Sequence, residues 1–341
     1  MSTTACIGDG TEGEESDPEA ASEEQALVTS SAIQHVFVIT MENNGASTIY
    51  GNTADCPYIN NTLMKTYAYS AGSTATSSNF IDELPSSIPS EPHYIWMEAA
   101  TNAFSDHTFT GDSDPSTTNS TKSTSHLVKK LDAKGVSWRA YEEGIDAKTG
   151  ACPIHSDSTI SSSYYAKHNP FVFFQDVSFT AGAPSTTNTY CASHMKGIGQ
   201  LATDITNNTV QNYSFITPNE CHDMHVSGCG TQTAAQKRKA GDTWLAANLP
   251  SLISYANTHQ GVIFITWDEP ERSTNAPFLV VGPHLKSAGY KSTLRYDHSS
   301  LVKSVQRIFQ VSPTQGIPYL AHAADAATND FQDFFSTGFY P

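Results

Sequence analysis

The chain has 341 residues, of which 38% are hydrophobic, which is enough for one large α/β domain or two small ones, and we expect one. Its formal charge of −16 and its pI near 5.1 argue against nucleic acid or an anionic membrane surface as a partner held by bulk electrostatics. Any phosphate that the protein handles must therefore meet local positive charge, such as a metal ion.

The start of the chain, residues 1–31, is rich in Asp and Glu and has no Lys or Arg. Such a segment cannot bury enough apolar surface to fold, so we expect an acidic disordered tail followed by one folded domain, residues 32–341. No signal-peptide pattern is visible, and no apolar run approaches the roughly 20 residues of a membrane span. Cys6, next to an acidic linker, would suit a lipid-anchored exported protein whose leader is absent from this chain. We therefore expect a secreted or cell-surface protein.

Strands and helices alternate along the rest of the chain. Patterns typical of buried strands lie at 33–40, 136–141, 212–219, 261–267 and 277–281. Patterns typical of helices lie at 58–65, 95–100, 125–134, 195–205, 243–258 and 298–309. Polar, loop-rich stretches at 68–90, 102–124 and 146–188 separate them. The alternation predicts an α/β fold with a mostly parallel, doubly wound sheet, flanked by helices and carrying loop-rich insertions.

The chain has six cysteines, and none forms a C-x-x-C pair, which argues against a zinc ribbon or a thioredoxin motif. Cys221 and Cys229 bracket a histidine-rich loop, and we expect a local disulfide between them. Cys56, Cys152 and Cys191 could supply one more bridge, whose partners the sequence does not determine. The alternative is a set of reduced, buried thiols in a cytosolic enzyme.

Polar side chains follow several of the predicted strands. Glu42-Asn43 and Asp268-Glu269 each come directly after a buried strand, Asp223 and His225 follow the strand at 212–219, and His298 begins a predicted helix. Ligands of open α/β sheets bind at the carboxyl ends of the strands. Carboxylates with an amide suit Mg²⁺ or Ca²⁺, whereas Asp/His sets suit Zn²⁺, Fe or Mn²⁺. Each signal alone also fits an ordinary loop or a helix N-cap, but together they indicate a metal or phosphate-chemistry site.

An ordered set of short motifs resembles a known family. The motifs are Val36–Asn43, Pro89-Ser90-Glu91-Pro92-His93-Tyr94, Lys167-His168-Asn169-Pro170-Phe171, Thr217-Pro218-Asn219 with Asp223-Met224-His225, Thr266–Glu269, Val281-Gly282-Pro283 and His298-Ser299. In this order they resemble the bacterial phosphoesterase family, which holds acid phosphatases and phospholipases C within the alkaline phosphatase-like superfamily. The resemblance runs from about residue 33 to about residue 310.

The resemblance implies a divalent metal held by five side chains: Glu42, Asn43, Ser90, Asp268 and Glu269. Ser90 would also be the nucleophile, because a serine hydroxyl bound to a dication attacks phosphorus far more readily than a free one. Ser86 and Ser87 are nearby competitors for this role. The resemblance leaves open whether one or two ions bind and whether they are Mg, Ca, Zn, Mn or Fe.

Further polar residues are expected around the phosphate. Asp223, His225 and His298 would bind a second metal, or contact the phosphoryl oxygens and protonate the leaving alcohol. His168 fits a phosphate contact, although it could also be a loop histidine packed against its aromatic neighbours. His93 stands where the family usually has asparagine. Weaker candidates for the cleft rim are His222, His107 and Asn102.

The motifs together predict a metal-dependent phosphoric ester hydrolase. We expect a secreted acid phosphatase that acts through a phosphoserine on a small phosphate ester or a phospholipid headgroup. One alternative is a phospholipase C that releases diacylglycerol, which needs an apolar rim around the site. Aromatic residues that could form such a rim, or could equally be core, are Phe104, Phe109, Tyr164, Tyr165 and Phe171–Phe174. Another alternative is a catalytically inactive metal- or phosphate-binding protein on the same fold.

Overall fold

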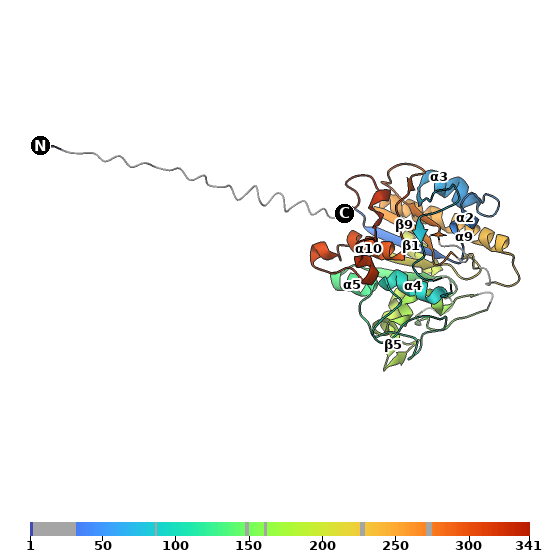
Figure 1. Ribbon diagram of the computed structural model, residues 1–341. Coiled ribbons are helices and arrows are strands. Elements are labelled where there is room, and N and C mark those ends of the chain that lie inside the picture. The colour runs from blue at the N-terminus through green and yellow to red at the C-terminus, as the bar shows by residue number, and fades with distance from the viewer. Residues whose placement is uncertain (3–31, 86, 147–149, 160–161, 226–228, 271–274) are drawn as a thin grey trace. The chain divides into compact units, whose positions relative to one another are not determined.

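The structure of the protein is a computed structural model that describes residues 1–2, 32–85, 87–146, 150–159, 162–225, 229–270 and 275–341. Most of the expected acidic tail and the candidate Ser86 lie outside the described residues. The strand and helix pattern of the rest is shown in Figure 1.

An eight-stranded sheet forms the centre, with the strand order β12-β2-β11-β9-β1-β8-β4-β7. The strands are β1 (His35–Met41), β2 (Ala68–Ser70), β4 (Trp138–Glu142), β7 (Met195–Gly197), β8 (Tyr213–Thr217), β9 (Gly261–Trp267), β11 (Phe278–Val281) and β12 (Lys291–Ser292). Within this sheet β11 pairs antiparallel with β9 and β2, and the other pairings are parallel. The predicted mostly parallel sheet is confirmed.

Helices cover both faces of the sheet. The α-helices are α2 (Ala46–Ile49), α3 (Met64–Thr66), α4 (Ser90–Ala99), α5 (Leu127–Lys134), α6 (Gln175–Ser178), α7 (Thr189–His194), α8 (Ile198–Asn207), α9 (Ala234–Thr258) and α10 (His298–Ile308). Short π or 3₁₀ turns lie at Ile59–Leu63, Ala166–His168, Pro170–Phe173, Pro313–Gln315, Ala321–Ala324 and Phe331–Phe334. Two small antiparallel pairs, β3 (Phe80–Ile81) with β10 (Asn275–Ala276) and β5 (Phe179–Thr180) with β6 (Ala183–Pro184), complete the elements.

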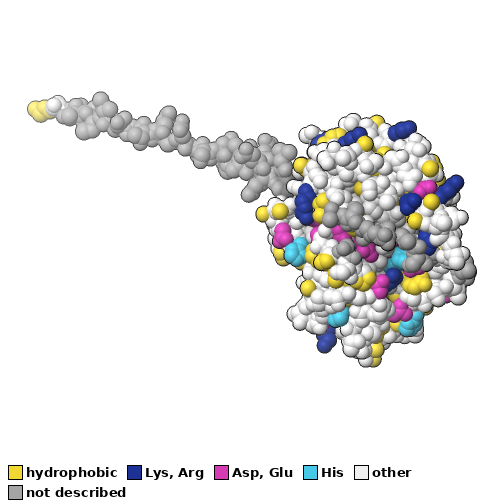
Figure 2. Space-filling model, turned by 45° about the vertical axis from the view of Figure 1, so that its right-hand side comes forward, with side chains coloured by type: hydrophobic (Ala, Val, Ile, Leu, Met, Phe, Trp, Pro, Cys, Tyr) yellow, Lys and Arg dark blue, Asp and Glu magenta, His cyan; other side chains and the backbone are white. Residues whose placement is uncertain are grey.

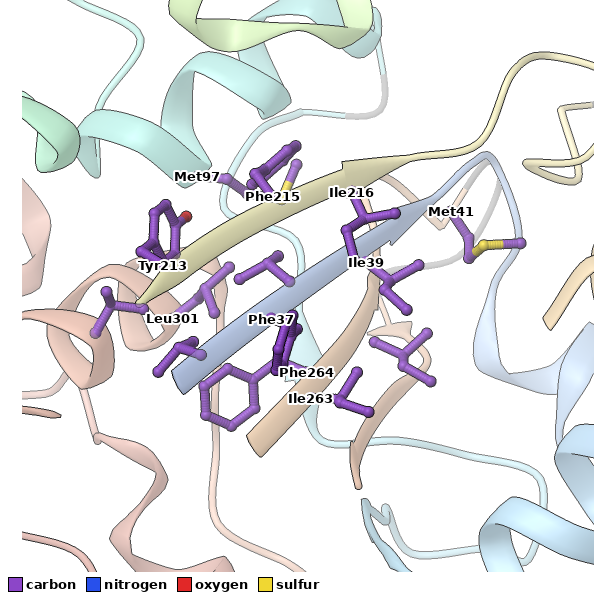
Figure 3. Packing of buried hydrophobic residues seen from close by; sticks show 14 of the residues in the cluster. Phe37, Ile39, Met41, Met97, Tyr213, Phe215, Ile216, Ile263, Phe264 and Leu301 are labelled. Atoms are coloured by element: carbon purple, nitrogen blue, oxygen red, sulfur yellow. The ribbon is translucent and has the colours of Figure 1, made fainter. Parts of the chain in front are cut away.

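The two central strands are buried on both faces, as their continuous apolar sequences predict. On one face, Thr40 Oγ1 of β1 lies 3.8 Å from Met97 Sδ of α4, and Figure 3 shows Met97 beside Phe215 of β8. On the other face, the Phe37 ring meets Tyr255 of α9 with 6.3 Å between ring centroids. The core therefore fixes α4 against the strand ends that carry the polar residues.

Several elements differ from the sequence-based prediction. Helix α4 begins at Ser90 instead of near residue 95, because a proline at position 92 falls in the first turn, where no intrahelical N–H bond is lost. The expected helix 195–205 begins at Ile198, since 195–197 pair with β4 as strand β7. Strands as short as β2 and β7 are too brief to show an alternating pattern. Helix α9 begins well before the expected residue 243, at Ala234, after a capping box made by Thr233 and Gln236.

The expected Cys221–Cys229 disulfide is confirmed, and a second bridge joins Cys152 to Cys191. Cys56 is a buried free thiol. Among the described residues, no helix combines the length and apolar character needed to cross a membrane.

The two disulfides close loops of different length, which leads to a prediction. The partners are 39 residues apart in Cys152–Cys191 and 8 apart in Cys221–Cys229. Because the loss of loop-closure entropy grows with loop length, replacing the first pair with Ser should lower the free energy of unfolding by about 4 kcal/mol, and the second pair by about 2.5 kcal/mol. Urea unfolding of both double variants measures this. Equal losses would show that loop length does not set the effect.

Candidate active site

The carboxyl ends of β1 and β9 bring the two predicted acidic motifs together. Asn43 N donates to Asp268 Oδ1 at 3.1 Å, and Asp268 N donates to Met41 O at 2.9 Å. Asn43 adopts a positive φ of 49°, which turns the chain sharply after the strand and lets its side chain donate to Glu42 Oε2 at 2.7 Å. Glu42 and Asp268 are both fully buried.

Ser90 stands at the first position of α4 and faces these carboxylates. Its Oγ lies 3.1 Å from Glu42 Oε2 and 3.5 Å from Glu269 Oε1, and its residue is 2% exposed. The first N–H groups of a helix have no intrahelical partner, so an anion at this end is favoured by the helix dipole. The hydroxyl of Ser90, the three carboxylates and the N-terminus of α4 therefore lie close together.

Lys167 and His93 offset only part of the negative charge of these carboxylates. Burial raises the pKa of Glu42 and of Asp268, and burial raises that of Glu269 to about 7. Glu42 Oε1 and Asp268 Oδ2 are buried without a hydrogen-bond partner among the described residues. A divalent cation would satisfy both observations. The oxygen donors of Glu42, Asn43, Ser90, Asp268 and Glu269 fit a hard cation, and a nitrogen of His93 lies near those of the last two residues.

One face of the molecule carries many acidic side chains. Figure 2 shows Asp and Glu side chains gathered near the centre of one face, with His side chains beside them and Lys and Arg mostly toward the edges. This arrangement favours cations over anions unless a bound ion reverses the local charge.

One set of expected residues lies beside Glu42. His168 Nε2 is 3.2 Å from Glu42 Oε1, at an angle that makes no hydrogen bond, and its ring stacks on Tyr94 with 5.0 Å between centroids. Glu42 N donates to Asp223 O at 2.7 Å, and Asp223 Oδ1 accepts from His225 N at 2.7 Å. Burial lowers the pKa of His168, and burial with the nearby Lys167 lowers that of His225 to about 4. The loop after β8 thus contributes a buried carboxylate and one neutral imidazole, and the turn Ala166–His168 contributes a second imidazole.

The other two expected histidines, His93 and His298, each face a further carboxylate. His93 Nε2 is 3.1 Å from Asp82 Oδ1, and His298 Nδ1 is 3.2 Å from Glu83 Oε2. Burial lowers the pKa of both imidazoles, but the partner carboxylates more than offset this and raise both pKa values overall. Among the described residues, no group of possible metal ligands joins His298 to Asp223 and His225, so a shared role of these three residues stays a prediction.

Sequence reasoning missed three polar residues near the site. Asp82 and Glu83 lie in a segment expected to be loop, and only their contacts reveal them. Asn44 is buried and donates to Glu42 O at 3.0 Å and to Met224 O at 3.2 Å, so it ties the β1 end to the Asp223 loop. The position of Asn44 directly after Glu42-Asn43 could have indicated that it lies near the site.

The weaker candidates make local contacts. His222 pairs with Glu143 at 2.9 Å, His107 lies 3.2 Å from Asn119 Oδ1, and Asn102 donates to Phe109 O at 2.8 Å.

The aromatic residues considered for an apolar rim are mostly core. The residues that are at most 2% exposed are Phe109, Tyr164 and Phe171–Phe174, whereas Phe104 and Tyr165 are partly buried.

The sequence matches known proteins along most of its length. The model of the Phosphoesterase family matches residues 84–312. The phosphatidylinositol-3-phosphatase of Mycobacterium tuberculosis is 23% identical over 294 residues, which cover 86% of this chain and 80% of that protein. A probable acid phosphatase of Kluyveromyces lactis is 29% identical over 190 residues, which cover 53% of this chain and 41% of that protein. An acid phosphatase of Aspergillus fumigatus is 26% identical over 202 residues, which cover 58% of this chain and 40% of that protein.

Solved structures share the fold. A lipoteichoic acid synthase from Listeria monocytogenes superposes with a TM-score of 0.53 at 11% identity, over 85% of this chain and 74% of that chain. A phosphonate monoester hydrolase from Silicibacter pomeroyi superposes with a TM-score of 0.51 at 12% identity, over 90% of this chain and 77% of that chain.

Because the carboxylates lie close together, Asp268→Asn should have opposite effects on thermal stability without and with a divalent cation. In the metal-free protein, Asp268→Asn removes one of several repelling buried charges, so the midpoint of thermal unfolding should rise. With a divalent cation present, the same variant should gain less stability than the wild type, because a ligand is lost.

Thermal unfolding with and without added Mg²⁺, Ca²⁺, Mn²⁺ or Zn²⁺ tests both halves of this prediction, and elemental analysis gives the bound ion. A variant that is less stable than the wild type without metal and equally stabilised by metal would contradict it.

Proposed function

The chain belongs to the Phosphoesterase family and is a hydrolase of phosphoric esters, and we propose that it is a metal-dependent phosphomonoesterase of the acid phosphatase type that acts through a phosphoserine at Ser90. The observation that carries this proposal is the position of Ser90 Oγ, 3.1 Å from Glu42 Oε2 at the N-terminus of α4. A hydroxyl in this position faces both the proposed cation ligands and a helix end suited to a phosphoryl group.

The proposed reaction has two steps that share one set of residues. A divalent ion held by Glu42, Asn43, Asp268 and Glu269 would favour the ionised serine and neutralise the phosphoryl oxygens. Ser90 Oγ forms a bond to phosphorus in line with the bond that breaks, and the leaving alcohol takes up a proton. Water then attacks phosphorus, and Ser90 is released with inorganic phosphate as product.

The histidines beside Glu42 are suited to the proton transfers. His168 and His225 lie next to Asp223, with 6.3 Å between their ring centroids, and the Tyr94 stack holds His168 in place. In this proposal a neutral imidazole takes the proton of Ser90 and passes it to the leaving alcohol in the first step. In the second step it takes a proton from the attacking water and returns it to Ser90.

Several observations support a monoester substrate and an exported protein. Most of the aromatic side chains that could have formed an apolar rim are buried, which removes the main sequence argument for a phospholipase C. A relative is named a phosphatidylinositol-3-phosphatase, so a phosphomonoester on a lipid headgroup is a substrate to test beside small esters. Two disulfides and the names of the fungal relatives support export, because disulfides persist in oxidising compartments.

Replacement of the nucleophile gives the direct test. Ser90→Ala should lower kcat for p-nitrophenyl phosphate by at least about a thousandfold, since the step that forms the covalent intermediate is lost. Ser87→Ala is the control, because Ser87 is exposed and lies three residues before the proposed nucleophile. Acid quenching during turnover, followed by mass spectrometry, should find phosphate on Ser90. Full activity of the Ser90→Ala variant would refute the assignment.

The substrate class can be tested separately. We expect kcat/KM for p-nitrophenyl phosphate to exceed that for bis(p-nitrophenyl) phosphate, and we expect phosphate release from phosphatidylinositol 3-phosphate in mixed micelles. Release of diacylglycerol from phosphatidylcholine or phosphatidylinositol would favour the phospholipase C alternative instead. A protein that binds the metal but hydrolyses none of these esters would be the inactive binding protein.

A further inference from the structure

Two adjacent carboxylates, Asp82 and Glu83, each hold one buried histidine. Asp82 Oδ1 and Oδ2 lie 3.1 Å and 3.3 Å from His93 Nε2, and His93 belongs to α4. Glu83 Oε2 lies 3.2 Å from Nδ1 of His298, the first residue of α10. The other oxygen of Glu83 accepts from Ser299 N at 2.7 Å and from Ser299 Oγ at 3.1 Å. The two carboxylates therefore join the segment before α4 to both helices.

The far side of each imidazole contacts the backbone directly before a site residue. His93 Nδ1 is 2.9 Å from the carbonyl oxygen of Pro89, which precedes Ser90. His298 Nε2 is 3.0 Å from the carbonyl oxygen of Trp267, which precedes Asp268. Each ring thus connects a carboxylate to the peptide that sets the position of a residue in the proposed reaction.

The same atoms resemble a cation site, since ligand atoms of Asp82, Glu83 and His298 all lie within 4.8 Å of one another. Their contacts argue for another role. Glu83 Oε1 accepts two hydrogen bonds from Ser299, and Asp82 Oδ1 also accepts from Leu84 N at 3.0 Å. Glu83 Oε2 lies 3.2 Å from His298 Nδ1, at an angle that makes no hydrogen bond. In contrast, Glu42 Oε1 and Asp268 Oδ2 are buried without a hydrogen-bond partner among the described residues. Two carboxylates beside two imidazoles can balance their charges without an ion.

We propose that the pairs Asp82–His93 and Glu83–His298 form a positioning clamp that fixes Ser90 relative to Asp268 and Glu269. The proposal rests on the proposed function, in which Ser90 attacks phosphorus. A displacement of about 1 Å in reacting groups can cost about a hundredfold in rate, so a clamp of this kind acts on kcat more than on substrate binding. The clamp touches no substrate in this account and works through the backbone of Pro89 and Trp267.

The test compares variants of the full chain, loaded with divalent metal, with a matched control. Asp82→Asn and Glu83→Gln keep side-chain size but remove the charge. The control is Asp176→Asn, because Asp176 Oδ1 and Oδ2 also lie 3.1 Å and 3.3 Å from a buried histidine, His126 Nε2, and neither residue belongs to the proposed site. All three variants should lower the midpoint of thermal unfolding.

Only the two clamp variants should lower kcat for p-nitrophenyl phosphate, by about 10- to 100-fold, with KM within about threefold of the wild type. The rate of Ser90 phosphorylation in a single turnover should fall by the same factor, and the bound metal per chain should not change. A fall in kcat with nearly unchanged KM cannot come from lost stability alone, because the control variant has the same lowered midpoint of thermal unfolding.

Two outcomes would overturn the clamp. If the clamp variants keep their kcat, as the control does, the pairs only stabilise the fold. If the wild type binds two ions per chain and Glu83→Gln loses one of them, the cluster is a cation site. Phosphoserine trapping on the wild type separates these outcomes from a failure of the proposed function, which would leave Ser90 unphosphorylated.

Discussion

The concentration of buried carboxylates at the ends of β1 and β9 is the constraint on which the rest of the site depends. Glu42 and Asp268 are fully buried, Glu269 is nearly so, and burial raises the pKa of each. Ionised carboxylates without partners are expensive in a protein interior, so the fold must hold them in place against their mutual repulsion. The parallel β1–β9 register, which runs unbroken from His35 with Gly261 to Met41 with Trp267, supplies that rigidity.

The sheet also explains why the buried carboxylates next to β1 and β9, with their unfavourable free energy, occur only where these two strands end. Along β9, and along β1 after its first residue His35, the side chains are apolar or are threonines that are fully buried. Helices α4 and α9 pack on opposite faces. Only where the strands end do polar groups enter. Helix α4 begins at that point, and the positive end of its dipole offsets negative charge there. The buried carboxylates of Glu42 and Glu269 thus lie next to the N-terminus of α4.

The sequence contained most of the fold and the centre of the site, but not its surroundings. Strands β1 and β9 were predictable because long, continuous apolar runs end in Glu42-Asn43 and Asp268-Glu269, and the order of parallel strands then brings those ends together. The role of Ser90 came from its resemblance to family motifs. Asp82, Glu83 and Asn44 were missed because their partners are far away in the chain or are backbone atoms, and no spacing rule reports such contacts.

Few positive charges are available near the site among the described residues of this acidic chain, and Lys167 is an example. Lys167 is next in sequence to His168, yet its Nζ lies 2.8 Å from Asp112 Oδ2, and Asp112 Oδ1 accepts from the N–H of Glu91 beside Ser90 at 3.0 Å. The charge of this lysine is therefore already paired with a carboxylate that helps to fix the start of α4. A dianionic phosphate ester approaching a chain of net charge −16 needs attraction from another source. These residues can provide oxygen donors for a divalent ion, and such an ion would turn the buried negative charges into the means of binding an anion.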